Sequence, residues 1–267
     1  MKFKFVISDF DGTLGVSPGI IADSTVDAIK EYQKKGGKFV LCTGRMYDSA
    51  IRICRNHGLT GDFVCYQGAI IANIETEEIL FSGGLTAEES IEIVTDLTKE
   101  DRTVLIDIDS ELYFNKVNDY TTGYCTRSSI KGECHEDLIK LIKEKNGITQ
   151  KIMCMNDDDH LYRLLKELKD KYNGKYEVNL SGGHLLEVIN PKCDKGHATK
   201  FLAKRYGIDL KDTMAVGDSL NDKNLLTCGV YGVCVGDGFP ELKEVADEVT
   251  LPFDEKPVEY LLKKYCL

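Results

Sequence analysis

Near its start the chain carries an apolar run that stops at two acids, Phe5-Val6-Ile7-Ser8-Asp9-Phe10-Asp11-Gly12-Thr13. Such a run is typical of a buried strand, and Asp9 stands where that strand would end. Gly12 and Thr13 then favour a turn. Ligands of open α/β sheets bind at the carboxyl ends of the strands. Two acids at this place therefore indicate either a metal site or a nucleophile paired with an acid–base group.

The same motif has two simpler interpretations. Asp and Gly are common in solvated turns, so Asp-x-Asp-Gly alone is also typical of an ordinary turn. It further resembles part of a calcium-binding loop, but the third acid and the closing Glu of that pattern are missing. The choice depends on what the rest of the chain places beside these acids.

Composition predicts a folded, acidic protein. The chain has 267 residues, of which 42% are apolar, and a formal net charge of −10. This length is enough for one large domain or two smaller ones with a sizeable core. The acidic balance argues against nucleic acid or an anionic membrane as a partner. A phosphorylated substrate stays possible, because a metal ion can invert the local field.

The cysteines and the N-terminal residues predict a cytoplasmic protein. The ten cysteines form no Cys-x-x-Cys pair, and several, such as Cys42 and Cys154, lie within apolar runs. We expect reduced, buried thiols rather than a zinc ribbon or a redox motif. Asp9 and Asp11 interrupt any signal-peptide core, and no apolar run has the length of a membrane span.

The order of the expected elements predicts two domains. Alternating strands and helices are expected at residues 2–8, 22–35, 38–42, 46–56 and 63–66, with a hairpin at 69–81. This rhythm predicts a parallel sheet with right-handed crossovers. After Gly84 the expected elements are hairpins and helices. The alternation of strands and helices resumes from Lys195, with helices expected at 196–206, 221–227 and 240–246. We therefore expect an α/β core of residues 1–83 and 189–267, interrupted by an inserted α+β domain of residues 84–188.

Three further motifs place polar groups at the edge where the first two acids lie. Thr43-Gly44-Arg45 follows the second strand and combines a hydroxyl, a glycine and a helix N-terminus, which suits an anion, although alone it is more typical of an N-cap. Lys195 opens a helix, where a lysine is unfavourable for the helix dipole unless it reaches an anion. A solvated surface lysine is the simpler interpretation.

The last of these motifs is Ala215-Val216-Gly217-Asp218-Ser219-Leu220-Asn221-Asp222. An apolar strand again ends at an acid, and Asp222 follows Asp218 by four residues, so a helical turn would bring both to one centre. A capping role does not explain the second acid. Acids, a lysine and a hydroxyl around one point suit Mg²⁺ and a phosphoryl group. Under the turn-and-cap interpretation the shared placement would be a coincidence.

In this order the motifs resemble the four motifs of the haloacid dehalogenase superfamily. The insertion between the second and third motifs resembles a C2-type cap. Tyr66-Gln67-Gly68-Ala69 and Asp194-Lys195-Gly196 resemble the Cof-type branch of sugar-phosphate phosphatases. The chain departs twice from that branch, with Gln67 where Asn is usual and Gly236-Asp237-Gly238 where Gly-Asn-Ala is usual.

The resemblance implies a Rossmann-like core and a Mg²⁺-dependent phosphatase of small phosphate monoesters that works through an aspartyl phosphate. Asp9 would be the nucleophile and Asp11 the general acid–base. The implied Mg²⁺ ligands are Asp9, Asp11 through its backbone carbonyl, Asp218 and, in support, Asp222. The implied ligands of the phosphoryl oxygens are Thr43, Gly44, Lys195 and Asn221. The cap would select the substrate, and sugar phosphates, pyridoxal phosphate, flavin mononucleotide and erythrose phosphate all stay open.

Two other functions use similar groups. A phosphotransferase or phosphomutase on the same core would pass the phosphoryl group to a sugar instead of water. A signalling receiver also forms an aspartyl phosphate, but it is one small domain whose acid follows a middle strand. Within the cap, the turn at residues 181–184 is a candidate substrate contact, with His184 itself interpreted as a strand-end residue.

Overall fold

The computed structural model describes residues 1–181 and 184–267 and divides into two compact units. The first unit comprises Met1–Ser82 and Asp194–Leu267, and the second comprises Gly83–Cys193. The expected turn residues Gly182 and Gly183 lie outside the described residues. In the part of the chain that is described, no helix combines the length and the apolar character that crossing a bilayer requires.

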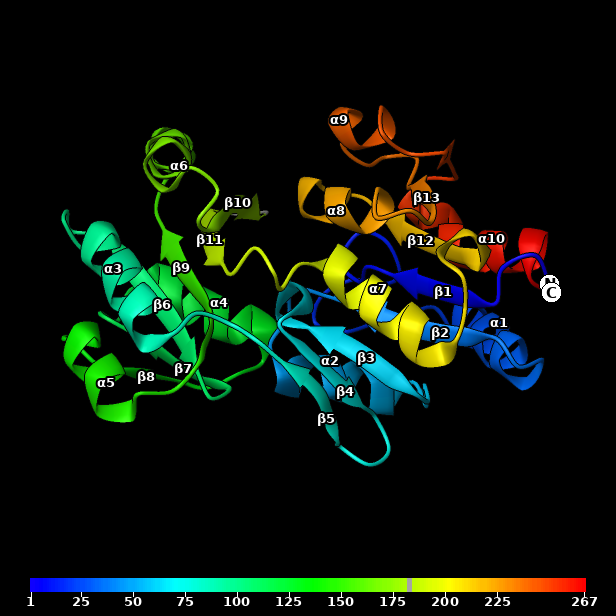
Figure 1. Ribbon diagram of the computed structural model, residues 1–267, viewed down its shortest axis with the longest axis horizontal. Helices are drawn as coiled ribbons and strands as arrows, with labels where there is room; N and C mark the ends of the chain where they lie inside the picture. Colours follow the sequence, from blue (N-terminus) through cyan, green and yellow to red (C-terminus); the bar gives the residue numbers. More distant parts are fainter. Residues whose placement is uncertain (182–183) are drawn as a thin grey trace. The chain divides into compact units, whose positions relative to one another are not determined.

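The sheet of the first unit contains, within the described residues, eight strands in the order β14-β13-β12-β1-β2-β3-β4-β5 (Figure 1). All neighbours from β14 to β3 are parallel, and β4 and β5 continue the sheet in antiparallel fashion. The strands are β1 (Phe5–Ser8), β2 (Lys38–Cys42), β3 (Asp62–Cys65), β4 (Ile70–Asn73), β5 (Ile79–Ser82), β12 (Thr213–Gly217), β13 (Tyr231–Cys234) and β14 (Glu248–Val249). The central position of β1 puts Asp9 between the strands that precede Thr43 and Asp218.

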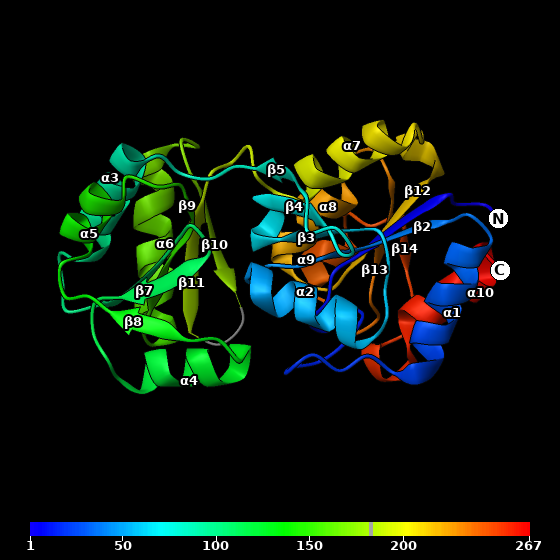
Figure 2. The ribbon, with the colours of Figure 1, turned by 90° about the horizontal axis from the view of Figure 1, so that it is seen from below.

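Helices cover both faces of this sheet (Figure 2). They are α1 (Asp23–Lys34), α2 (Tyr47–Asn56), α7 (Lys195–Tyr206), α8 (Lys223–Leu226), α9 (Pro240–Lys243) and α10 (Pro257–Tyr265). One face packs on α7 and α8 through a core that includes Phe5, Ile7 and Leu202, and α1 and α2 lie against the other. Because both faces are covered, β1 is buried at all four positions, which explains its continuous apolar sequence.

The second unit is an α+β domain. Its described residues form a six-stranded sheet in the order β10-β11-β9-β6-β7-β8, antiparallel except for the β7–β8 pair. The elements are α3 (Ala87–Leu97), β6 (Thr103–Ile108), β7 (Glu111–Phe114), α4 (Asp119–Ser128), β8 (Gly132–Cys134), α5 (Leu138–Lys145), β9 (Thr149–Met155), α6 (Asp158–Tyr172), β10 (Glu177–Ser181) and β11 (Leu185–Ile189). Apolar residues of α3, α5 and α6 pack together with one face of the sheet.

The structure confirms the predicted fold class, an α/β core with a parallel sheet, and departs from the sequence analysis in detail. The helix expected at 221–227 shrinks to α8, because a 3₁₀ turn at Leu220–Asp222 precedes it and site residues lie in that turn. The helix expected at 240–246 is confined to α9. Helix α4 and strand β8 were not expected. Helix α4 contains Gly123 and threonines, which favour helix weakly, and a capping box between Asn118 and Thr121 fixes its start.

Candidate active site

Three neighbouring strands of the first unit end at one edge of its sheet, and a polar residue follows each. Strand β1 lies between β12 and β2 and runs parallel to both. Asp9 follows β1, Asp218 follows β12 and Thr43 follows β2. The Asp9 N–H donates to the Val216 carbonyl over 2.9 Å, which extends the ladder to the point where the acids begin. The structure thus brings these residues to one edge, as expected for parallel strands.

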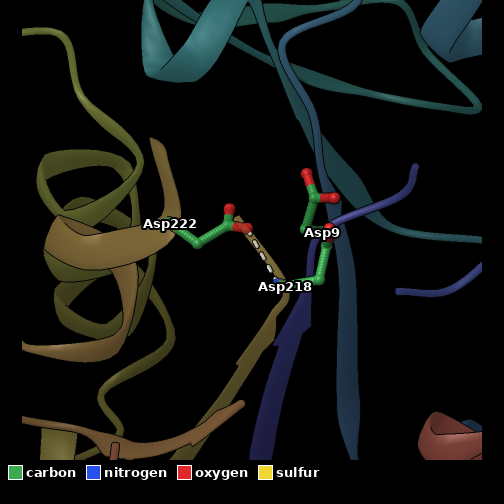
Figure 3. A group of neighbouring side chains, drawn as sticks. All are labelled: Asp9, Asp218 and Asp222. Atoms are coloured by element: carbon green, nitrogen blue, oxygen red, sulfur yellow. Dashed lines mark hydrogen bonds between the residues drawn. The ribbon is translucent and has the colours of Figure 1, made fainter. Parts of the chain in front are cut away.

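Three carboxylates meet at this edge (Figure 3). One oxygen each of Asp9, Asp218 and Asp222 lies within 4.8 Å of the others. The loop after Asp9 holds Asp218 in place, because the Thr13 hydroxyl donates to Asp218 Oδ1 over 2.8 Å. Gly12, with φ +82°, has no room for a side chain, since a Cβ there would lie 2.8 Å from Asp218 Oδ2. The two motifs at Asp9 and Asp218 therefore form one structural unit.

Lys195 joins two of these carboxylates. It is the first residue of α7, and its side chain is 1% exposed. Its ammonium group donates to Asp9 Oδ1 over 2.5 Å and to Asp222 Oδ1 over 2.6 Å. These two contacts offset the unfavourable dipole at the helix start. The simpler interpretation as a solvated surface lysine is wrong.

Asp222 supports the turn that carries Asp218. Its Oδ2 accepts from the backbone N–H groups of Asp218 and Ser219, both over 3.1 Å, and Figure 3 shows the first of these bonds. Gly217 permits this approach, since a Cβ there would lie 2.6 Å from Asp222. With Oδ1 bound to Lys195, both oxygens of this buried carboxylate are engaged. Asp222 therefore lies behind Asp9 and Asp218 as a support.

The cluster carries more negative charge than Lys195 offsets. Burial raises the pKa of Asp9 well above its usual value, Lys195 acts in the opposite direction, and Asp222 and Asp218 add to the rise. Burial and the neighbouring Asp222 carboxylate raise the pKa of Asp218 to about 6. Burial disfavours the charged form of Lys195, but Asp222 and Asp9 outweigh it and raise the pKa of the ammonium group. With all three carboxylates ionised, the single ammonium group leaves two negative charges, which the two positive charges of a divalent cation would neutralise.

The donor set fits a hard divalent cation such as Mg²⁺. This ion prefers oxygen ligands and is usually bound by one or two carboxylates together with substrate phosphates. Asp9 and Asp218 offer carboxylate oxygens from adjacent strand ends, and Asp222 fixes the turn that carries Asp218. The charge excess and the oxygen chemistry together make this edge the candidate metal centre of the protein.

The structure does not bring the Asp11 carboxylate into the cluster. Arg45 donates to both of its oxygens, from Nε over 2.9 Å and from Nη2 over 2.6 Å. The guanidinium group also donates to the Pro18 carbonyl over 3.1 Å and lies over the Phe10 ring at 4.8 Å. The motif Thr43-Gly44-Arg45 contains this arginine, but the sequence alone does not identify its partner, because several acids are expected nearby.

Thr43 does not cap a helix, contrary to the simpler interpretation of its motif. Helix α2 begins at Tyr47, and its N-cap is Met46. The Thr43 side chain is buried at the sheet edge, where its hydroxyl accepts from the Arg45 N–H over 3.2 Å. The hydroxyl hydrogen therefore remains for another acceptor.

Asn221 and Gly44 meet through Gln67. Asn221 lies in the turn before α8, and its Nδ2 donates to Gln67 Oε1 over 3.4 Å. The Ser219 hydroxyl donates to Asn221 Oδ1 over 2.6 Å. A Cβ on Gly44 would overlap the Gln67 amide nitrogen. The candidate phosphoryl ligands of the second and fourth motifs thus share one neighbour.

The side chains of Asp237 and His184 each contact a residue outside the acid cluster. The exposed Asp237 carboxylate accepts from the Phe253 N–H over 3.0 Å. The contact with Asp218 in this segment comes from the main chain, because the Phe239 N–H donates to the Asp218 carbonyl over 2.8 Å. In the second unit, His184 directly precedes β11, and its Nδ1 lies 2.9 Å from Asp158 Oδ1.

Comparison with known proteins agrees with this site. A model of the haloacid dehalogenase-like hydrolase family matches residues 6–262 of the chain. The chain is 27% identical to phosphatase YwpJ of Bacillus subtilis, over an alignment that covers 97% of this chain and 99% of that protein.

Solved structures share the fold. A haloacid dehalogenase-like hydrolase from B. subtilis superposes with a TM-score of 0.87 at 24% identity, covering 97% of this chain and 99% of that one. The subclass IIB sugar phosphatase BT4131 superposes with a TM-score of 0.82 at 20% identity, covering 98% of both chains. Both similarities extend over the core and the inserted unit alike.

Proposed function

The chain belongs to the haloacid dehalogenase-like hydrolase family, and from this premise we propose that it is a phosphatase of small phosphate monoesters. The observation that carries the proposal is the contact of buried Lys195 with Asp9 and Asp222, beside Asp218. Carboxylates that bind a cation, together with a protonated lysine, suit a phosphoryl group at the same edge. The similarity to proteins named phosphatases, one of them a sugar phosphatase, supports sugar phosphates as the substrate class.

Asp9 is the nucleophile of the proposed reaction. Its carboxylate oxygen forms a bond to phosphorus while the bond from phosphorus to the leaving alcohol breaks, which gives an aspartyl phosphate. Lys195 orients the carboxylate through Oδ1. Across residues 1–181 and 184–267, no hydrogen bond is formed to Asp9 Oδ2, which leaves this oxygen for the attack. Water then attacks the phosphorus, releases inorganic phosphate and regenerates Asp9.

Asp11 is the proposed general acid–base. It gives a proton to the leaving alcohol oxygen in the first step and takes one from the attacking water in the second. In the structure both oxygens of Asp11 are bound to Arg45, and the side chain is 51% exposed. The role therefore requires that the carboxyl group leave Arg45 during the reaction, and its exposed position gives it room to do so.

The remaining residues bind the charged groups. We propose that Asp9, Asp218 and the Asp11 backbone carbonyl hold Mg²⁺, with Asp222 in support. When bound, Mg²⁺ withdraws charge from the phosphoryl oxygens and offsets their repulsion from the carboxylates. The phosphoryl oxygens are bound by the Lys195 ammonium, the Thr43 hydroxyl, the Gly44 N–H and the Asn221 amide. These donors stabilise charge that grows on the oxygens as the bond to phosphorus changes.

We propose that the second unit selects the leaving alcohol, since every assigned residue belongs to the first unit. The proposed compartment is the cytoplasm. The ten cysteines all lie in the described residues as free thiols, which favours a reducing environment.

The experiment is an assay of phosphate release from a panel of sugar phosphates and from p-nitrophenyl phosphate. We expect turnover that stops on thorough chelation and returns with Mg²⁺. The Asp9→Asn variant should be inactive, while Asp27→Asn, the same change at an exposed position of α1, should be fully active. Turnover that survives removal of metal would contradict the metal role. Transfer to a second sugar with little free phosphate would indicate the phosphotransferase instead.

A further inference from the structure

Gln67 lies at the same sheet edge as the acid cluster and has no role in the reaction described so far. It follows β3, the neighbour of β2, in the turn Tyr66–Gly68. Its side chain is buried, 5% exposed. A primary amide has two hydrogens to donate and an oxygen that accepts, so its burial demands several partners. The contacts of this side chain therefore show what it does.

The backbone of Gln67 adopts a conformation that glutamine rarely takes. Its φ is 60° and its ψ is 14°, in the left-handed region, and the preceding Tyr66 has φ 51°. Asparagine and glycine reach this region more easily than other residues. Strained backbone of this kind persists where its surroundings require it, often at functional sites. A glutamine here therefore points to a contact that needs its longer side chain.

The main chain of this turn is bonded to the loop after β2. The Tyr66 N–H donates to the Arg45 carbonyl over 2.9 Å, and the Gln67 N–H donates to the Thr43 carbonyl over 3.1 Å. Gly44 lies between these two acceptors, and a Cβ on it would overlap Nε2 of Gln67. The Gln67 amide therefore lies against the peptide at Gly44, inside the loop proposed to hold phosphoryl oxygens.

The oxygen of the Gln67 amide faces Asn221. Asn221 Nδ2 donates to Gln67 Oε1 over 3.4 Å, which is a long hydrogen bond. At its other end, Asn221 Oδ1 accepts from the Ser219 hydroxyl over 2.6 Å. The Asn221 amide is therefore oriented from both ends, with its NH₂ group toward Gln67. One hydrogen of that group remains for a phosphoryl oxygen.

We propose that Gln67 is a positioning residue that ties the loop after β2 to the turn after β12. These two segments carry Gly44 and Asn221, and β1 separates the strands that lead to them. The Gln67 amide spans this separation, with one end at each segment. An asparagine is one methylene shorter, so we expect it to lose the contact with Asn221. The inference rests on the proposed function, because it assigns the two segments to phosphoryl binding.

The test measures inorganic phosphate binding by titration calorimetry in Mg²⁺, and kcat and KM with p-nitrophenyl phosphate. Gln67→Ala and Gln67→Asn should each weaken phosphate binding and raise KM by up to about tenfold, the effect of losing one hydrogen bond between neutral groups, with a smaller change in kcat. Gln67→Asn should keep or raise the Tm, because asparagine tolerates the left-handed backbone better. A merely structural role would lower the Tm and leave phosphate binding unchanged.

A matched control and a double variant sharpen the result. Gln33→Ala removes the same amide from α1, where Gln33 Nε2 donates to the Thr60 carbonyl over 2.9 Å, and should leave phosphate binding unchanged. The double variant of Gln67→Ala with Asn221→Ala should lose clearly less than the product of the two single losses, because the residues act together. Losses that multiply would overturn the proposal.

The outcomes separate this inference from the function on which it rests. If the unmodified protein releases no phosphate from any ester, the proposed function fails. If it hydrolyses esters and binds phosphate, but the Gln67 variants bind phosphate as Gln33→Ala does, the inference alone fails.

Discussion

Replacing Lys195 by methionine should destabilise the metal-free protein, and added Mg²⁺ should restore part of the loss. Methionine keeps most of the apolar length of the side chain and removes its charge. In the unmodified protein the ammonium group binds Asp9 and Asp222, and all three side chains are at most 8% exposed. The variant therefore leaves buried carboxylates without their cation.

The size of the effect follows from that burial. Removing one partner of a buried ion pair typically costs about 3–5 kcal/mol. For a unit of this size, such a loss lowers the Tm by roughly 6–20 °C. Without Lys195 the pKa of Asp9 should rise further, since the ammonium is what opposes the effect of burial. A carboxyl group with a raised pKa in the folded state takes up a proton on folding, so the deficit of the variant should shrink as the pH falls from 8 to 5.

Mg²⁺ should act in the same direction as low pH. A cation whose free concentration is one hundred times its Kd stabilises the folded state by about 2.7 kcal/mol. The variant cluster carries one more uncompensated negative charge, so we expect its Tm to rise more with Mg²⁺ than that of the unmodified protein. The assay is thermal unfolding of both proteins in EDTA and in Mg²⁺, at several pH values.

Lys151→Met is the matched control. Lys151 is also buried, at 3% exposure, and binds the Glu187 carboxylate over 2.8 Å, but it lies in the second unit. Its removal should lower the Tm as well, and Mg²⁺ should restore none of that loss. An equal response to Mg²⁺ in both variants, or a Lys195→Met variant as stable as the unmodified protein in EDTA, would refute the reasoning.

Asp9→Asn is expected to abolish phosphate release and to leave the circular dichroism spectrum unchanged, because the amide keeps the shape of the carboxylate and is no nucleophile. Asp11→Asn should slow hydrolysis of sugar phosphates on the order of 10²–10⁴-fold, and that of p-nitrophenyl phosphate less, because its leaving group needs little protonation; equal losses would argue against the acid role. Mild thiol alkylation should leave activity intact, because burial raises the pKa of the Cys42 thiol and keeps it protonated; inactivation that substrate prevents would show that a thiol lines the site. Burial acts to raise the pKa of Asp96, but hydrogen bonds from Lys171 and other donors outweigh it and lower the pKa. Asp96→Asn should therefore unfold more easily than the unmodified protein at neutral pH, and the difference should vanish as the pH falls through about 4 and below; a difference that persists at low pH would contradict this.

The sequence was sufficient to predict the backbone of the site. Apolar runs marked β1, β2 and β12 as buried strands, and alternation with helices predicted that they run parallel in one sheet; the structure shows that they are neighbours. In such a sheet the residues after each strand share one edge, so the proximity of Asp9, Thr43 and Asp218 follows from topology alone. Helix α4 was missed because its residues form helix weakly by themselves, and its start depends on a capping contact that leaves only a faint pattern in the sequence.

The burial of Lys195 required the structure. A lysine at a helix start is ordinarily solvated, and only the two carboxylates that contact it make its burial favourable. One of these, Asp222, also has its other oxygen fixed by the turn that follows β12. The sequence predicts that these residues lie at the same edge, but it does not identify which oxygen each donor contacts.

The Asp11 carboxylate pairs with Arg45, a contact that the sequence does not predict. The exposure of this pair also bears on the proposed catalysis. The Asp11 side chain is 51% exposed, whereas Arg45 is 12% exposed and donates to both oxygens of the carboxylate. A contact between side chains of loops that are distant in the sequence leaves no periodic pattern there, unlike the burial of a strand. Because about half of the Asp11 side chain is exposed, we expect its carboxyl group to exchange Arg45 for a leaving oxygen without moving residues of the core. Asp9, held by Lys195 at a buried strand end, has no such freedom. The proposed nucleophile is thus held by a buried contact and the proposed acid–base group is exposed, and this difference suits the two proton transfers, on different oxygens, that we propose for Asp11.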